Sequence, residues 1–193
     1  MRILAIVGSL REGSLNRQLA EAAGKELSAV DPQAEFAILD WADVPLFNQD
    51  IEVPAPEPVS RVRREVLSAD GIWVFTPEYN HFFPGTLKNL LDWLSRPVGA
   101  GQGQALDGKP LAVSGISAGG SGTACAQDHL VTLASFLNMR VMNKPRLTIP
   151  HGFDKVVDGR LELGDSLPYL RRQAEAFVEF VGYLARRTRE RHA

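Results

Sequence analysis

Short, wholly apolar runs alternate along the chain with stretches in which apolar residues recur every three or four positions. The run Ile3–Val7 is continuous and ends at Gly8, which is typical of a strand buried on both faces of a sheet. From Ser14, a residue type suited to a helix N-cap, apolar residues follow at helical spacing as far as Leu27. Glu35–Leu39 is predicted to form the second strand.

The alternation continues to the far end of the chain. Residues 43–58 carry four prolines and no steady period, so they are predicted to form a long surface loop. Beyond that loop the pattern predicts a short helix to about Ser68, a strand at Ile72–Phe75 and a helix that Pro84 begins and Pro97 ends. A glycine-rich connection at 99–108 then leads to a strand at Leu111–Ile116 and a helix at about 122–137. A fifth strand is expected somewhere within 139–149, followed by a last helix through Leu167–Leu184.

Five strands alternating with five helices predict an α/β fold. Such alternation implies parallel strands joined by right-handed crossovers, with helices on both faces of the sheet. Five strands fit the doubly wound, flavodoxin-like order 2-1-3-4-5. No internal repeat or second unit is evident, so residues 1–193 are predicted to form a single domain.

Composition narrows the class of protein. Among 193 residues, 45% are hydrophobic and 23% charged, and the net charge of -2 argues against a dedicated nucleic-acid binder. The single cysteine, Cys125, allows no intramolecular disulfide, which favours a reducing compartment. The N-terminal apolar run is too short for a signal peptide, and no later run reaches membrane length. We therefore expect a cytoplasmic protein without a nucleic-acid or membrane partner.

A ligand-binding site in this fold is expected beyond the carboxyl ends of the first, third and fourth strands, near the point where the strand order reverses. The loop after Val7 leads into a helix N-terminus, which favours an anion such as a phosphate. It lacks the G-x-G-x-x-G pattern, and Ser14-Leu15 stands where a Walker motif needs lysine. The alternative is a tight turn shaped by Gly and Ser. The polar candidates in this loop are Ser9, Arg11, Ser14 and Asn16.

The other two loops at this edge differ in character. Residues 76–85 include the aromatic residues Tyr79, Phe82 and Phe83, which could hold a flat ring system or pack inward or against a second subunit. Residues 117–123 are almost all small, so they either let a ligand approach the backbone closely or form a flexible linker.

No residue is assigned as a catalytic acid, base or metal ligand. The histidines and Cys125 show no metal-binding spacing along the sequence. His81 is predicted to lie at the surface or an interface, and Cys125 to be a buried, inert thiol. Trp73 and Trp93 are expected in the core or an interface.

The motifs at these loops resemble a known family. Gly8-Ser9-Leu10-Arg11 with Ser14 and Asn16, the segment Thr76-Pro77-Glu78-Tyr79-Asn80, and the helix sequence of residues 84–94 are similar to the NAD(P)H-dependent FMN reductases, which include bacterial chromate and quinone reductases. The resemblance extends from Met1 to about Leu137. Relatives often carry arginine where this chain has Cys125.

The resemblance implies specific roles at the site. The FMN phosphate would be held by Ser9, Arg11, Ser14 and Asn16, with Leu15 beside them; the isoalloxazine ring would be lined by Pro77, Glu78, Tyr79 and Asn80, and bordered on its other edge by Ser117 and Gly119. It also implies a homodimer or homotetramer that associates through the helix at 84–96.

The activity implied is hydride transfer from NADPH or NADH to bound FMN, followed by reduction of a quinone, a flavin or another small acceptor. Two alternatives stay open: a flavodoxin-like electron carrier and a flavin-binding regulatory module without turnover. The near-neutral charge and the absence of a Thr-Gly-Asn-Thr phosphate loop count against a carrier. The resemblance favours NADPH over NADH as the hydride donor.

Overall fold

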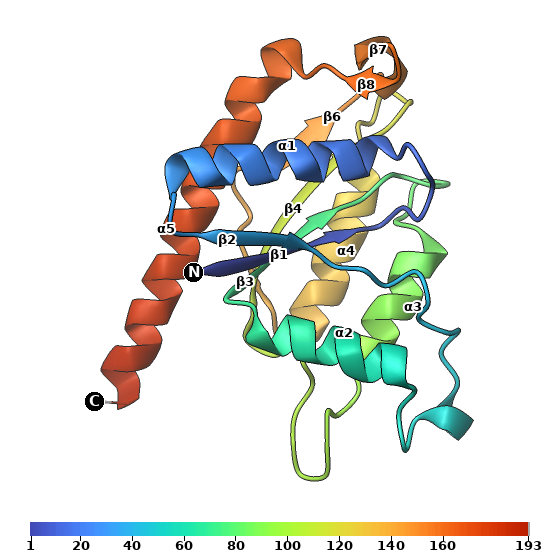
Figure 1. Cartoon of the computed structure of the whole chain (residues 1–193), viewed down its shortest axis with the longest axis vertical. Helices are drawn as coiled ribbons and strands as arrows, with labels where there is room; N and C mark the ends of the chain where they lie inside the picture. The colour runs from blue at the N-terminus through green and yellow to red at the C-terminus, as the bar shows by residue number, and fades with distance from the viewer. Residues whose placement is uncertain (193) are drawn as a thin grey trace.

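The computed structural model describes residues 1–192, and side chains for residues 1–190. Figure 1 shows a central sheet with helices on either side. The main elements are β1 (Arg2–Val7), α1 (Leu15–Val30), β2 (Glu35–Ile38), α2 (Glu57–Ser68), β3 (Gly71–Phe75), α3 (Gly85–Leu94), β4 (Pro110–Ile116), α4 (Ala124–Phe136), β5 (Arg140–Val141), β6 (Leu147–Ile149), β7 (Val156–Val157), β8 (Arg160–Leu161) and α5 (Leu167–His192). Short 3-10 helices lie at Gln49–Ile51, Gly152–Lys155 and Gly164–Ser166.

The sheet has the order β2-β1-β3-β4-β5, with every neighbouring pair parallel. This confirms the predicted α/β fold and its flavodoxin-like strand order. The fifth strand is divided: β5 pairs with the first part of β4, and β6 pairs with its last part. Pro145 lies between the two pieces and has no backbone N–H to donate to a strand ladder, which suits a break at this position.

Two layers of side chains hold the helices on the sheet. Side chains of β1 alternate between the layers, so Ile3 and Ala5 pack with α1 and α5, whereas Leu4 and Ile6 pack with α2, α3 and α4. Figure 1 shows α1 and α2 on opposite sides of the sheet. Trp73 and Trp93 are both fully buried, as predicted.

Local backbone conformation moves some of the predicted boundaries. Helix α2 begins at Glu57, so Pro58 lies in its first turn and not in the preceding loop. Helix α4 begins only at Ala124, because Gly122 and Thr123 have positive φ angles of 56° and 78° that a helix cannot use. The β7–β8 hairpin was not predicted, although its Asp158-Gly159 turn is a recognised hairpin signal.

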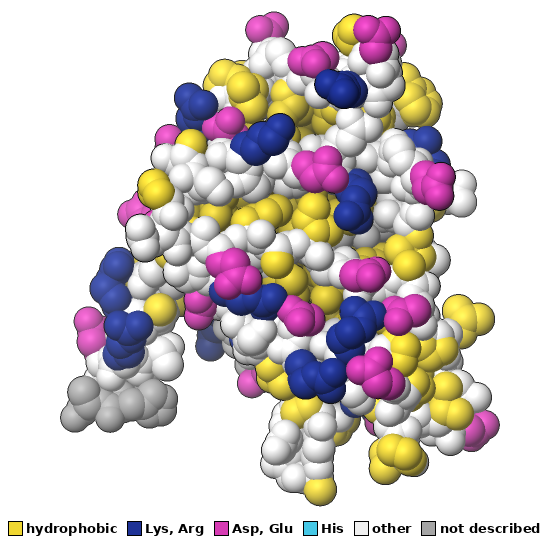
Figure 2. Space-filling view, in the orientation of Figure 1, with side chains coloured by type: hydrophobic (Ala, Val, Ile, Leu, Met, Phe, Trp, Pro, Cys, Tyr) yellow, Lys and Arg dark blue, Asp and Glu magenta, His cyan; other side chains and the backbone are white. Residues whose placement is uncertain are grey.

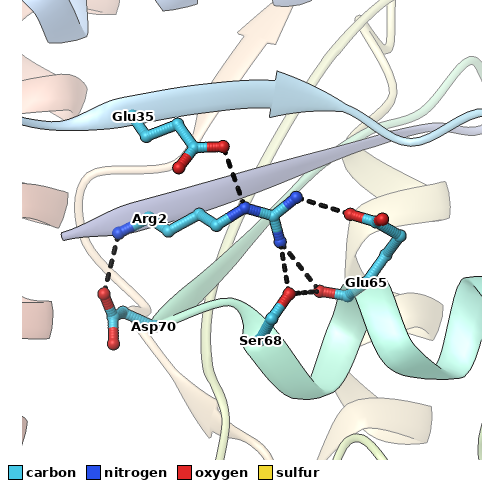
Figure 3. Close-up of polar contacts among 5 residues, drawn as sticks. All are labelled: Arg2, Glu35, Glu65, Ser68 and Asp70. Atoms are coloured by element: carbon cyan, nitrogen blue, oxygen red, sulfur yellow. Dashed lines mark hydrogen bonds and ion pairs between the residues drawn. The ribbon is translucent and has the colours of Figure 1, made fainter.

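A polar network ties together the amino end of the sheet (Figure 3). The guanidinium of Arg2 donates to Glu35 Oε1 on β2 at 3.0 Å and to Ser68 Oγ at the end of α2 at 2.6 Å. It also pairs with the carboxylate of Glu65, and this hydrogen bond holds the pKa of Arg2 above its ordinary value. The backbone N–H of Arg2 donates to Asp70, so one residue links β1, β2, α2 and the start of β3.

Charges of both signs are interspersed on the face shown in Figure 2, and no large patch of one sign covers it. A band of hydrophobic side chains crosses this face between α1 and α2, where the edge strand β2 lies. Among the described residues, no helix is both long enough and apolar enough to cross a membrane.

Candidate functional site

Three loops meet at the carboxyl edge of the sheet, as the strand order requires. We call residues 8–16 loop 1, residues 76–85 loop 2 and residues 117–123 loop 3. Gly8 N–H donates to the carbonyl of Phe75 at 2.8 Å, so loop 1 and loop 2 leave the sheet side by side. A Cβ on Gly8 would lie 3.1 Å from Thr76 Oγ1, and one on Gly115 would lie 2.3 Å from both Thr76 O and Thr123 Oγ1. The glycines therefore permit the close approach of all three loops.

Loop 1 presents its polar groups at the N-terminus of α1. Ser14 is buried, and its hydroxyl accepts a hydrogen bond from the Arg17 N–H at 3.3 Å, as an N-cap does. Arg11 is exposed, and its guanidinium reaches only the carbonyl of Gly13, at 3.1 Å. Ser9 is partly buried, with its hydroxyl accepting from the Arg11 N–H. The loop thus combines hydroxyl groups, an exposed cation and the positive end of a helix dipole.

Asn16 has a different environment from its neighbours in loop 1. Its side-chain amide is buried, donates to the Ile116 carbonyl at 2.9 Å and accepts from the Ile116 N–H at 3.1 Å. Both ends of the amide are therefore engaged with the last residue of β4. Leu15 packs partly buried against the core below. The geometry makes Asn16 a link between loop 1 and the start of loop 3.

Loop 2 contains a tight turn. Tyr79 and Phe82 exchange backbone hydrogen bonds at 2.8 and 3.0 Å, and the two residues between them, Asn80 and His81, both have positive φ, as a type I′ turn requires. The turn leaves Tyr79 52% exposed, while Phe83 is buried. Pro77 is also buried, directly after β3.

Phe82 is half-exposed and stacks on His129 of α4, with ring centroids 4.3 Å apart. Of the three aromatic residues in loop 2, the structure therefore packs Phe83 inward and leaves Tyr79 and Phe82 at the surface.

Glu78 binds the first turn of α4. Its carboxylate accepts from the Ser121 hydroxyl at 2.7 Å and from the Ala126 N–H at 3.1 Å, although Thr123, the N-cap residue, makes no side-chain capping bond. Burial acts to raise the pKa of Glu78, but the hydrogen bonds from Ser121 and the α4 backbone outweigh it and lower the pKa. Glu78 thus connects loop 2 to loop 3 and supplies the missing cap.

Loop 3 is open on one side and anchored on the other. Gly119 is exposed, and a Cβ added to it would meet no atom within 4 Å. The Ser117 carbonyl accepts from the Gly152 N–H at 2.8 Å, and the Gly119 carbonyl accepts from the His151 N–H at 3.3 Å. Residues 149–152, which the sequence did not single out, therefore support this loop.

The surroundings of Cys125 differ from the prediction. Cys125 is partly exposed and not buried, because it lies in the first turn of α4. Its sulfur, a carboxylate oxygen of Glu78 and a ring nitrogen of His81 all lie within 4.8 Å of one another. The sequence spacing predicted no such cluster, since Glu78 and His81 lie in loop 2 and Cys125 lies more than forty positions further along, in α4. His81 lies at the surface as expected, with its side chain 82% exposed.

The residues of this edge fit an FMN molecule chemically. Loop 1 offers hydroxyl donors and Arg11 at a helix N-terminus, which suit a phosphate group. Loop 2 offers exposed aromatic and polar groups, and loop 3 offers a backbone that a flat ring could approach without meeting a side chain at Gly119.

Comparisons with known proteins point to the same chemistry. A 2-hydroxy-1,4-benzoquinone reductase of a Burkholderia species is 36% identical over 182 residues, covering 94% of this chain and 96% of that protein. A quinone reductase of Escherichia coli is 36% identical over 186 residues, covering 94% and 95% of the two chains. An NAD(P)H-dependent FMN reductase of Pseudomonas aeruginosa is 37% identical over 185 residues, with coverage of 94% and 95%.

A solved structure agrees with these sequences. FerB, a flavoenzyme NAD(P)H:(acceptor) oxidoreductase from Paracoccus denitrificans, superimposes with a TM-score of 0.82 at 34% identity and covers 94% of this chain and 97% of its own. Residues 1–154 also match the sequence profile described as NADPH-dependent FMN reductase. The chain therefore belongs to the NADPH-dependent FMN reductase family.

Proposed function

We propose that this protein binds FMN at loops 1, 2 and 3, receives hydride from NADPH or NADH and reduces quinones or similar small acceptors. The observation that carries the proposal is the meeting of three unlike loops at one edge of the sheet: one with phosphate donors, one with exposed aromatic and polar groups, and one with an open backbone. Relatives more than one third identical along nearly the whole chain are named quinone and FMN reductases.

The phosphate would bind at loop 1. Ser9, Ser14 and the backbone around Leu15 would donate hydrogen bonds, and Arg11 is free to swing its charge toward the phosphate. Because both ends of its amide already bind Ile116, Asn16 would act mainly by holding loop 1 in place. We assign it as a positioning residue for the phosphate site.

The ring would lie between loop 2 and loop 3. Pro77, Tyr79 and Asn80 would line it, and Ser117 and Gly119 would border the opposite edge. The Glu78 carboxylate is occupied by Ser121 and the α4 backbone, so Glu78 would contribute its own backbone groups to the ring. The type I′ turn keeps this wall rigid, which orients the ring for its reaction partners.

When bound, FMN would supply the redox chemistry, accepting hydride from the nicotinamide and passing electrons to the acceptor. The protein would contribute position and charge. Arg11 and the N-terminus of α1 would stabilise the negative phosphate, and the backbone of loop 3 would favour negative charge developing at the ring edge. No side chain is assigned as a general acid or base.

Further features of the proposal concern the whole protein. Residues 1–193 would act as one flavin-binding domain, assembled as a homodimer or homotetramer through the region of α3. The single cysteine favours the cytoplasm as its compartment. A small-molecule acceptor suits a site whose loop 2 leaves Tyr79 and Asn80 exposed.

The test is an absorption spectrum of the protein saturated with FMN, recorded without oxygen before and after adding NADPH. We expect bound-flavin bands that bleach and return when a quinone is added. Bands that form but do not bleach with NADPH or NADH would favour an electron carrier or a regulatory module. No flavin binding at all would overturn the assignment of the three loops.

A further inference from the structure

The cluster of Glu78, His81 and Cys125 has the composition of a metal site. The fold brings it together from two separate segments, the tight turn of loop 2 and the first turn of α4. The three ligand atoms lie within 4.8 Å of one another. We propose that these side chains bind one Zn²⁺ ion, with water as the fourth ligand.

The ligand types favour zinc over the other common divalent ions. Thiolate and imidazole are preferred by Zn²⁺, whereas Ca²⁺ and Mg²⁺ favour sets made of oxygen atoms. A thiolate from Cys125 and a carboxylate from Glu78 would together balance the two positive charges of the ion. His81 would add a neutral nitrogen, so the occupied site carries no net charge.

The geometry requires only a small contraction. Zinc–ligand bonds of about 2.0–2.3 Å place two ligands of a tetrahedral site roughly 3.3–3.7 Å apart. His81 Nδ1 and Glu78 Oε1 are already 3.4 Å apart. The widest pair in the cluster must therefore draw in by at most about 1.1–1.5 Å, which is the difference between its 4.8 Å limit and the required spacing.

The freedom for this contraction lies in His81 and Cys125. The His81 side chain is 82% exposed, and among the side chains that the structure describes its ion-pair contact is with Glu78, so its ring can rotate while staying beside that partner. Cys125 is partly exposed on α4.

The Glu78 carboxylate can accept an ion in addition to its hydrogen bonds. A carboxylate offers about four lone-pair directions, and this one receives hydrogen bonds from Ser121 and Ala126. The carboxylate therefore keeps capacity for an ion on the side of His81, its ion-pair partner. Those two hydrogen bonds also fix the carboxylate in place, as groups outside the ligand set of a metal site commonly do.

Occupancy would change how loop 2 is held. Without the ion, the Glu78 carboxylate connects loop 2 to the start of α4, and Phe82 stacks on His129 further along the helix. With it, the exposed end of the turn at His81 would also be fixed to α4 through Cys125. The site therefore lies beside the wall proposed for the flavin ring, yet its assembly does not depend on flavin.

The experiment is calorimetric titration of the untagged, full-length protein with ZnCl₂, with and without saturating FMN. We expect one Zn²⁺ per chain, and about a hundredfold weaker binding in Cys125→Ser and in His81→Ala, since each removes a direct ligand. Co²⁺ should give a thiolate-to-cobalt absorption band that Cys125→Ser abolishes. Glu78 is left intact because its loss would also uncap α4.

His151→Asn is the matched control, because His151 is an exposed histidine that lies outside the cluster, and asparagine tolerates its positive φ of 53°. The zinc affinity of this control should differ by no more than about threefold from that of the protein with unchanged sequence. That change is much smaller than the one expected when a ligand is lost. Melting temperatures of all three variants check that they fold. The proposal is overturned if the unchanged chain binds no zinc, or if either ligand variant binds as tightly as it does. Either result leaves the flavin proposal standing, because the readout is zinc binding itself.

Discussion

Asn16 and Ile116 are joined by a reciprocal pair of hydrogen bonds, although they lie a hundred positions apart in the chain. The Asn16 amide donates to the Ile116 carbonyl at 2.9 Å and accepts from its N–H at 3.1 Å. Both residues are buried, so water cannot replace either bond. This pair fixes the start of α1 against the end of β4, and thereby sets the spacing between loop 1 and loop 3.

Asn16→Ala should therefore weaken both the fold and FMN binding. Two buried backbone groups would lose their partners, at a cost of roughly 1–3 kcal/mol each in the free energy of unfolding. Chemical denaturation measures this loss, and fluorescence titration measures FMN affinity. Asn48→Ala is the control, because Asn48 caps only a short exposed 3-10 helix. Equal stability of the two variants would contradict the role given to Asn16.

Arg11→Ala should weaken FMN binding far more than it slows hydride transfer within the bound complex. A charge-assisted hydrogen bond to the phosphate contributes about 1.5–3 kcal/mol, so we expect roughly tenfold to hundredfold weaker binding. The loss should shrink at high salt, since the Arg11 side chain is exposed.

The matched control for Arg11 is Arg17→Ala. Arg17 is also exposed, but its guanidinium lies beside Glu21 on the surface of α1, at 3.5 Å. Titration of FMN fluorescence at two salt concentrations compares the variants. Unchanged FMN affinity in Arg11→Ala would remove Arg11 from the phosphate site.

Gly115→Ala should destabilise the protein strongly. The added Cβ would lie 2.3 Å from Thr76 O and 2.3 Å from Thr123 Oγ1, and the first of these is a backbone atom that cannot move without shifting β3. Overpacking of this kind costs about 1–3 kcal/mol or more. Gly103→Ala, where a Cβ meets no atom within 4 Å, serves as the control in the same thermal denaturation experiment. Similar melting temperatures for Gly115→Ala and Gly103→Ala would show that the chain around Gly115 has room for a methyl group, contrary to the packing described.

Gly119→Ala separates ligand contact from protein packing. Its Cβ would meet no protein atom within 4 Å, so the melting temperature without FMN should not change. If the ring borders this residue, the methyl group would crowd it, and FMN affinity should fall by about tenfold, or roughly 1.4 kcal/mol. Normal FMN affinity in this variant would place the ring elsewhere along loop 3.

The sequence predicted the sheet well because both of its signals are strong. Short, continuous apolar runs such as Ile72–Phe75 are typical of strands buried on both faces, and the alternation with helices constrained the strand order. The fifth strand was harder, because its two short pieces flank Pro145 and neither has a clear period. The β7–β8 hairpin was also not predicted, because its two-residue strands are too short to show a period, even though Asp158-Gly159 is a turn signal.

At the candidate site, sequence reasoning identified three loops that the fold does bring together, but not how their side chains are used. Ser14 and Asn16 both look like neutral donors in sequence, yet one caps α1 and the other binds β4. Glu78 gave no sign of capping α4, because its partners lie more than forty positions away in the chain. Contacts between distant segments, including the cluster around Cys125, depend on the fold and have no local pattern.

The lengths of the outermost strands bear on how copies of this protein could associate. The sheet ends on one side at β2, with four residues, and on the other at β5, with two, and β6, with three. So little unpaired backbone offers a poor template for joining two sheets edge to edge, which is a common route to aggregation. Any oligomer would consequently form through contacts between helix and loop surfaces, and extension of the sheet into a fibre is disfavoured from both ends.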